Sequence, residues 1–152
     1  MDKKSSQDGD DLLGAILGER YRIVSAISRG GMGVVYRAQH IVLDKPVAVK
    51  VMLQTQDEGA HQRFLQEAKL ASLVHHPNIV EIFDYGHTDD GTFYYVMEYV
   101  PGLSLDELVR RYGSLPPERV VYLLCQICDA LREAHAVGLI HRDLVPPSTI
   151  AA

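Results

Sequence analysis

The stretch that decides the fold is residues 28–50, which read SRGGMGVVYRAQHIVLDKPVAVK. A glycine-rich turn at residues 30–33 separates two apolar runs of β-prone residues. Glycine has no side chain and accepts positive φ angles, so such a turn can lie over a phosphate chain with its N–H groups pointing inward. In the second run Ala48 and Lys50 are two residues apart, so a strand places them on one face. This pattern favours a nucleotide, with its base against Ala48 and its phosphates against Lys50.

The glycine cluster alone also fits a flexible hairpin loop. A strand follows it, whereas a helix follows the glycines of a dinucleotide site or a P-loop. With the flanking strands and the run Val-Ala-Val-Lys that ends at Lys50, the stretch resembles the protein kinases. The run from Gly30 to Tyr36 looks like the bacterial Ser/Thr kinases of eukaryotic type in particular. Ser28 replaces the first glycine of the family pattern, so we expect weaker or altered phosphate contacts and an unchanged fold.

The composition is that of a cytoplasmic globular domain. The chain has 152 residues, 47% of them hydrophobic, and a net charge of −5. This charge gives no reason to expect binding to nucleic acid or to an anionic membrane surface. No apolar run is long enough for a membrane segment, and the polar residues 1–11 lack the apolar core of a signal peptide.

The apolar periodicity predicts strands at residues 21–27, 33–39, 47–53, 79–85 and 92–100, and helices at 56–74, 103–112 and 117–137. The resemblance implies an α+β fold. Its upper lobe is a five-stranded antiparallel sheet with one helix, and the first helices of the lower lobe follow. The expected organisation is a disordered or capping segment at 1–17, an upper lobe at 18–97, a hinge at 98–102 and a truncated start of the lower lobe at 103–152.

Glu67 lies at the edge of the apolar stripe of the helix predicted at 56–74. A carboxylate beside a buried face is costly unless it is paired. One interpretation is a solvated glutamate that points outward. The resemblance implies instead that Glu67 forms an ion pair with Lys50.

Pro101 and Gly102 interrupt the apolar pattern after the last predicted strand. The resemblance places the hinge here, with Met97 as gatekeeper, the backbone of Glu98 and Val100 against adenine, and Ser104 at the ribose. A helix N-cap at Ser104 is the alternative, and both can hold together. The residues that the resemblance assigns to ATP binding are Ile27, Ser28, Arg29, Gly30, Gly31, Met32, Gly33, Val35, Ala48, Lys50, Glu67, Met97, Glu98, Val100 and Ser104.

Two residue pairs have possible metal or redox chemistry. His75 and His76 are adjacent, but no further ligand follows at useful spacing, so no metal site is expected. Cys125 and Cys128 form a lone C-x-x-C pair on a predicted helix. Without a second pair or a thioredoxin-like pattern, this pair favours buried structural thiols over a zinc or redox site.

Residues 140–144, IHRDL, match the kinase catalytic loop, in which Asp143 would orient the substrate hydroxyl and accept its proton. Residues 145–152 read VPPSTIAA and contain neither the lysine nor the asparagine of the family pattern. Mg²⁺ is expected for the family, but its ligands are missing here.

We therefore expect a Ser/Thr protein kinase fragment, with Lys50 and Asp143 as its catalytic residues, that binds ATP and is inactive as this chain. Its protein substrate stays open. One alternative is a pseudokinase-like module that binds nucleotide or a partner without catalysis. Another is a regulatory fragment that associates with another kinase through the exposed helix at 117–137.

Overall fold

The computed structural model describes residues 12–31, 33–52, 58–141, 144 and 150–151 of the chain. These residues form two compact units, which are described separately. The first comprises Met1–Ala68 and Ile82–Tyr99, and the second Lys69–Glu81 and Val100–Ala152. The boundary after Tyr99 falls inside the segment 98–102 that the sequence predicts as a hinge.

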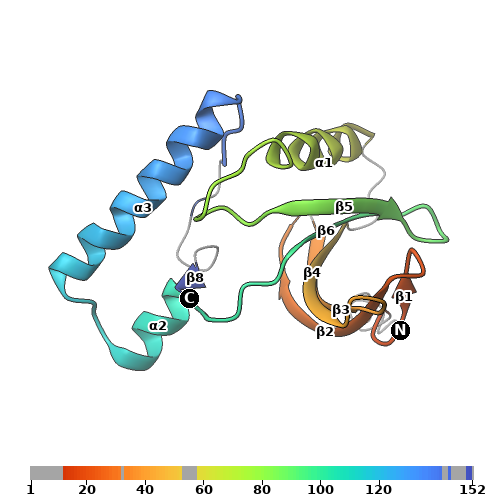
Figure 1. Cartoon of the computed structure of the whole chain (residues 1–152), viewed down its shortest axis with the longest axis horizontal. Coiled ribbons are helices and arrows are strands. Elements are labelled where there is room, and N and C mark those ends of the chain that lie inside the picture. Colours follow the sequence, from red (N-terminus) through yellow and green to blue (C-terminus); the bar gives the residue numbers. More distant parts are fainter. Residues whose placement is uncertain (1–11, 32, 53–57, 142–143, 145–149, 152) are drawn as a thin grey trace, which may run out of the picture. The chain divides into compact units, whose positions relative to one another are not determined.

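The first unit is built on a six-stranded sheet (Figure 1). Its strands are β1 (Ile16–Leu17), β2 (Tyr21–Arg29), β3 (Gly33–His40), β4 (Lys45–Met52), β5 (Ile82–His87) and β6 (Phe93–Glu98). They follow the order β1-β2-β3-β4-β6-β5, and every neighbouring pair is antiparallel. The five predicted antiparallel strands are confirmed, and β1 adds a short sixth strand at one edge.

The prediction of a disordered tail up to residue 17 is wrong for residues 12–17. The N–H of Gly14 donates to the carbonyl of Ile23, and the N–H of Ile23 donates to the carbonyl of Ala15, both over 2.9 Å. Leu17 is only 5% exposed and belongs to the main core. This segment therefore caps the edge of β2, as the alternative interpretation held. Residues 1–11 lie outside the described part of the chain.

The two faces of the sheet pack against different partners. One face forms the main core, whose buried residues are Leu17, Tyr21, Ile23, Val34, Tyr36, Ala38, Val47, Val49, Val51, Tyr94 and Val96. The other face packs against helix α1 (Glu58–Ala71) through a smaller core of Met52, Phe64, Ala68 and Tyr95. Strand alternation produces this division, because successive side chains of β4 point to opposite faces.

The sheet curls enough to join β2 to β5, which are far apart in the strand order. The hydroxyl of Tyr21 donates to Asp84 Oδ2 over 2.5 Å, and Arg20 Nη2 lies 3.0 Å from the same oxygen. Burial, and then the hydrogen bond to Asp84, raises the pKa of Tyr21 well above its usual value. The phenol therefore stays protonated and remains a donor at physiological pH.

Helix α1 and strand β5 differ in extent from their predictions. The helix predicted at 56–74 is observed as Glu58–Ala71, and residues 53–57 lie outside the described part. The strand predicted from residue 79 begins at Ile82. A turn precedes it, in which the N–H of Ile79 donates to the carbonyl of His76. This turn includes Ile79, the residue at which the predicted strand begins.

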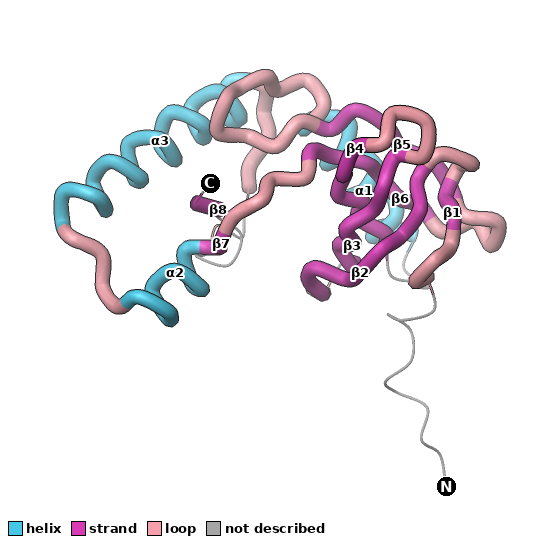
Figure 2. Tube along the Cα trace, turned by 60° about the horizontal axis from the view of Figure 1, so that its bottom comes forward, coloured by secondary structure: helices cyan, strands magenta, loops and turns pink. Residues whose placement is uncertain are grey.

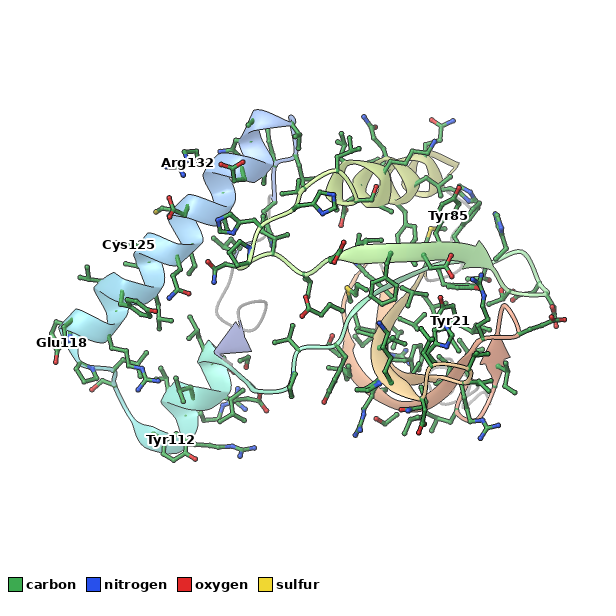
Figure 3. All side chains as sticks on the ribbon, in the orientation of Figure 1. Tyr21, Tyr85, Tyr112, Glu118, Cys125 and Arg132 are labelled. Atoms are coloured by element: carbon green, nitrogen blue, oxygen red, sulfur yellow. The ribbon has the colours of Figure 1, made fainter. Side chains whose placement is uncertain are left out.

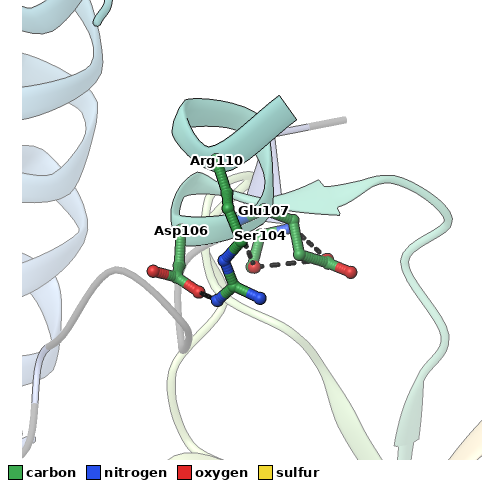
Figure 4. Close-up of polar contacts among 4 residues, drawn as sticks. All are labelled: Ser104, Asp106, Glu107 and Arg110. Carbon is green, nitrogen blue, oxygen red and sulfur yellow. Dashed lines mark hydrogen bonds and ion pairs between the residues drawn. The ribbon is translucent and has the colours of Figure 1, made fainter. Parts of the chain in front are cut away.

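The second unit contains helices α2 (Leu105–Tyr112) and α3 (Pro117–Ala136), and a pair of two-residue strands, β7 (Leu103–Ser104) and β8 (Ile150–Ala151), which run antiparallel (Figure 2). Ser104 is the N-cap of α2, as predicted. Its hydroxyl accepts the N–H of Glu107, whose carboxylate accepts the N–H of Ser104 (Figure 4). These hydrogen bonds to Ser104 are the main cause of the lowered pKa of Glu107.

Helix α3 exposes much of its apolar surface. Val121, Tyr122 and Leu124 are each more than half exposed. Cys125, which is labelled in Figure 3, and Cys128 are also exposed, so the prediction of buried thiols is wrong for this chain. The physical reason is that α3 buries only Ala130 and Ala134. Association through this face stays a prediction.

None of the helices in the described part is both long enough and apolar enough to span a membrane. The same residues contain no cluster of three or more potential metal ligands of the His, Cys, Asp or Glu type. Of the adjacent histidines, His75 Nδ1 lies 3.6 Å from Glu81 Oε1, and His76 Nδ1 accepts the N–H of Asn78.

Candidate functional site

Ala48 and Lys50 lie on one face of β4, as the sequence predicts. In the antiparallel register Lys50 is opposite Val35 on one side and Tyr95 on the other, and Ala48 is opposite Met97. Ala48 is 5% exposed, whereas the Lys50 side chain retains 21% of its exposure. A small buried residue therefore lies beside a cation that water, and thus an anionic ligand, can still reach.

The ion pair predicted between Lys50 and Glu67 is present. Lys50 Nζ lies 3.8 Å from Glu67 Oε1, and the glutamate side chain is 44% exposed. A partly hydrated pair of this kind contributes at most about 1 kcal/mol to stability.

Aromatic contacts hold α1, which carries Glu67, against the sheet. The Phe64 ring packs on Tyr95 with 5.1 Å between ring centroids. One turn earlier the His61 ring meets Phe93 edge-on at 3.9 Å. Phe64 and Tyr95 are almost fully buried. The position of Glu67 therefore depends on the packing of Phe64, which lies three residues earlier on the same face of α1.

Sequence reasoning missed Tyr95 as a neighbour of Lys50. The ammonium nitrogen lies 5.7 Å from the centroid of the Tyr95 ring and 6.0 Å from that of Phe64. Burial, and next the negative charge of Glu67, raises the pKa of Tyr95 well above its usual value. The alternation along β6 does place Tyr95 on the face of Met97. Only the register between β4 and β6, however, brings it opposite Lys50.

The glycine-rich turn closes between β2 and β3. The N–H of Gly30 donates to the carbonyl of Gly33 over 2.9 Å. A Cβ atom on Gly33 would collide with the carbonyl oxygen of Val51, so this glycine lets β3 and β4 approach each other. Gly30 and Gly31 have open space around them. The turn can therefore accept a ligand next to its backbone.

The other predicted ATP-binding residues are distributed over both units. Ile27, Ser28 and Arg29 are exposed at the end of β2, and Met97 packs on the smaller core beside α1. Glu98 ends β6, whereas Val100 and Ser104 belong to the second unit. Met32 and the predicted catalytic Asp143 lie outside the described residues.

The family model of the protein kinase domain matches residues 21–148. This chain therefore belongs to the protein kinase family. It is 42% identical over 141 residues to the serine/threonine-protein kinase pkn3 of Myxococcus xanthus, covering 91% of this chain and 26% of that protein. It is 41% identical over 137 residues to the serine/threonine-protein kinase PrkC of Bacillus subtilis, covering 89% of this chain and 21% of that protein.

Solved structures give the same result. The fold matches the crystal structure of the Mycobacterium tuberculosis PknI kinase domain with a TM-score of 0.76 and 30% sequence identity, over 91% of this chain and 57% of that chain. The chain thus spans about a quarter of the length of the curated relatives and just over half of a solved kinase domain.

Proposed function

We propose that this chain is the nucleotide-binding part of a Ser/Thr protein kinase and that it binds ATP. The observation that supports this most is the placement of Lys50, whose partly exposed ammonium lies 3.8 Å from Glu67 on the α1 face of the sheet. The strand β3 that leads out of the glycine turn lies directly beside it, with Val35 opposite Lys50. A cation beside the strand that leads out of a glycine turn, with open space around Gly30 and Gly31, suits a phosphate chain.

Each residue has a role in this proposal. The backbone of the glycine turn covers the phosphates, Lys50 neutralises part of their charge, and Glu67 orients Lys50. The adenine ring lies against Ala48, and the backbone at Glu98 and Val100 contacts its edge. Family resemblance adds Met97 as gatekeeper and Ser104 at the ribose. The described residues fit ATP because they supply an accessible cation beside a small, buried surface.

Transfer of the γ-phosphate to protein serine or threonine is the proposed activity of the complete family domain. We infer that this chain alone does not perform it. Residues 145–149, VPPST, contain neither the lysine nor the asparagine that follows the catalytic aspartate in the family. Magnesium supplies charge neutralisation on the phosphates in this family, and the asparagine is one of its ligands. For the isolated chain, this proposal makes the same prediction as the alternative of a pseudokinase-like module, namely nucleotide binding without phosphate transfer.

Affinities for ATP, ADP, AMP and adenosine test the proposal, measured by displacement of a fluorescent nucleotide from the unmodified chain with Mg²⁺ present. We expect affinity to rise with the number of phosphates, by about tenfold or more between adenosine and ATP, since charge-assisted hydrogen bonds contribute about 1.5–3 kcal/mol. Labelled ATP should transfer no phosphate to a generic protein substrate. Equal affinity for adenosine and ATP would refute the phosphate role. Transfer that is lost in Asp143→Asn would refute the inferred inactivity.

A further inference from the structure

The ammonium group of Lys50 is surrounded on the protein side by two aromatic rings and one carboxylate. Tyr95 comes from β6, directly opposite Lys50 in the sheet register, and Phe64 comes from α1. The nitrogen lies 5.7 Å and 6.0 Å from their centroids. Both distances are within the range in which a ring face attracts a cation.

The two rings are held more firmly than the carboxylate. Tyr95 and Phe64 are 6% and 4% exposed and pack on each other, so both rings are held by close packing. Glu67 is 44% exposed and lies 3.8 Å from the ammonium, so water competes for it. A lysine tethered only to such a glutamate would sample several rotamers. The buried ring faces limit that sampling to positions above them.

Tyr95 also places an uncharged aromatic ring beside the ion pair of Lys50 and Glu67. Burial, followed by the charge of Glu67, raises the pKa of its phenol, so no second anion forms next to Glu67 near neutral pH. Lys50 is therefore attracted by the ring without being neutralised by it. Its charge stays available to a ligand on the open side, where the side chain retains 21% of its exposure.

We propose that Tyr95, together with Phe64, is a positioning residue that holds the Lys50 ammonium over two aromatic faces and thereby presents it to the phosphates of a nucleotide. This inference rests on the proposed function for its ligand. Its geometry, which is the placement of the Lys50 ammonium over the Tyr95 and Phe64 rings, rests only on the described side chains. The two parts are therefore tested by different measurements.

Lysine side-chain NMR tests the geometry without any nucleotide. The chain has only five lysines, and Lys50→Met identifies the Lys50 signal by its loss. We expect the ε-CH₂ protons of Lys50 to be shifted upfield by ring currents relative to those of Lys69 on α1. Tyr95→Phe, which keeps the ring, should preserve the shift, and Tyr95→Leu should reduce it strongly. An unshifted Lys50 in the unmodified chain, or a shift unchanged in Tyr95→Leu, would overturn the proposal.

Nucleotide affinity tests the consequence. Tyr95→Leu should weaken ATP binding about 3- to 10-fold, the range expected from loss of a cation–π contact, and leave adenosine binding unchanged. Tyr95→Phe should match the unmodified chain. In the Lys50→Met background, Tyr95→Leu should have no further effect on ATP. A merely structural role would instead weaken ATP and adenosine equally in both backgrounds, and that result would refute positioning.

Two other outcomes can also be interpreted: a Tyr95→Leu variant that does not fold, and an unmodified chain that shows no preference for ATP. If Tyr95→Leu does not fold, Phe64→Leu removes the second ring and should give the same selective loss for ATP. If the unmodified chain shows no preference for ATP over adenosine, the proposed function fails. The upfield shift of Lys50 and its dependence on Tyr95 would then still decide whether the rings hold the ammonium.

Discussion

Lys50→Met is expected to weaken ATP binding by about 10- to 100-fold, because it removes charge-assisted hydrogen bonds that contribute about 1.5–3 kcal/mol. Adenosine binding should not change, since it uses no phosphate contact. Methionine keeps most of the side-chain volume, and Glu67 is 44% exposed, so its unpaired carboxylate can be hydrated. The fold should therefore survive. Affinities for both ligands, measured on one preparation, check this result.

Lys45→Met is the matched control. Lys45 begins the same strand and is exposed, and its ammonium lies 5.3 Å from the centroid of the Phe83 ring. The control changes the net charge by the same amount and also removes a lysine that lies beside an aromatic ring, but at a different place. It should bind ATP as the unmodified chain does. Equal losses in the two variants would mean that general electrostatic attraction, and not a site at Lys50, accounts for ATP binding.

Tyr36→Ala should produce the largest loss of stability. Tyr36 is 1% exposed and is the largest of the side chains that are almost completely buried in the main core. Removing a buried aromatic ring leaves a cavity and typically costs about 3–5 kcal/mol. Total stabilities are about 5–15 kcal/mol, so the first unit should be close to unfolding at room temperature. Urea unfolding followed by circular dichroism measures the difference.

Tyr85→Ala is the comparison for this loss. Tyr85 is on the edge strand β5 and is 68% exposed, so its removal should cost less than about 1 kcal/mol. If Tyr36→Ala does not fold at all, Tyr36→Leu leaves a smaller cavity and should give a measurable, intermediate loss. Similar losses for Tyr36→Ala and Tyr85→Ala would show that the assigned core is wrong.

The main strands and helices could be predicted from the sequence because each has a strong local pattern. The runs before and after the glycine turn are rich in β-branched residues, and α1 has its apolar stripe. Strand β1 could not be found this way. It has only two residues, and it exists because the backbone around Ile23 binds the preceding segment. Such a strand depends on its partner more than on its own composition.

The site could be predicted where chain spacing or family resemblance was sufficient. Ala48 and Lys50 share a face because they are two residues apart. The pair of Lys50 with Glu67 followed from the resemblance. Tyr95 was missed because its contact with Lys50 depends on the register of two strands 45 residues apart in the sequence. The exposure of Cys125 depends on what packs against α3, which a helical pattern does not specify.

The central claim is that ATP binds on the glycine turn and β4. Backbone ¹⁵N NMR spectra recorded during titration with MgATP test it most directly. We predict that the largest shift changes fall on residues 30–35, 47–50 and 98–100, and that α3 does not respond. Changes concentrated on α2 and α3, or none in residues 30–50, would contradict this account.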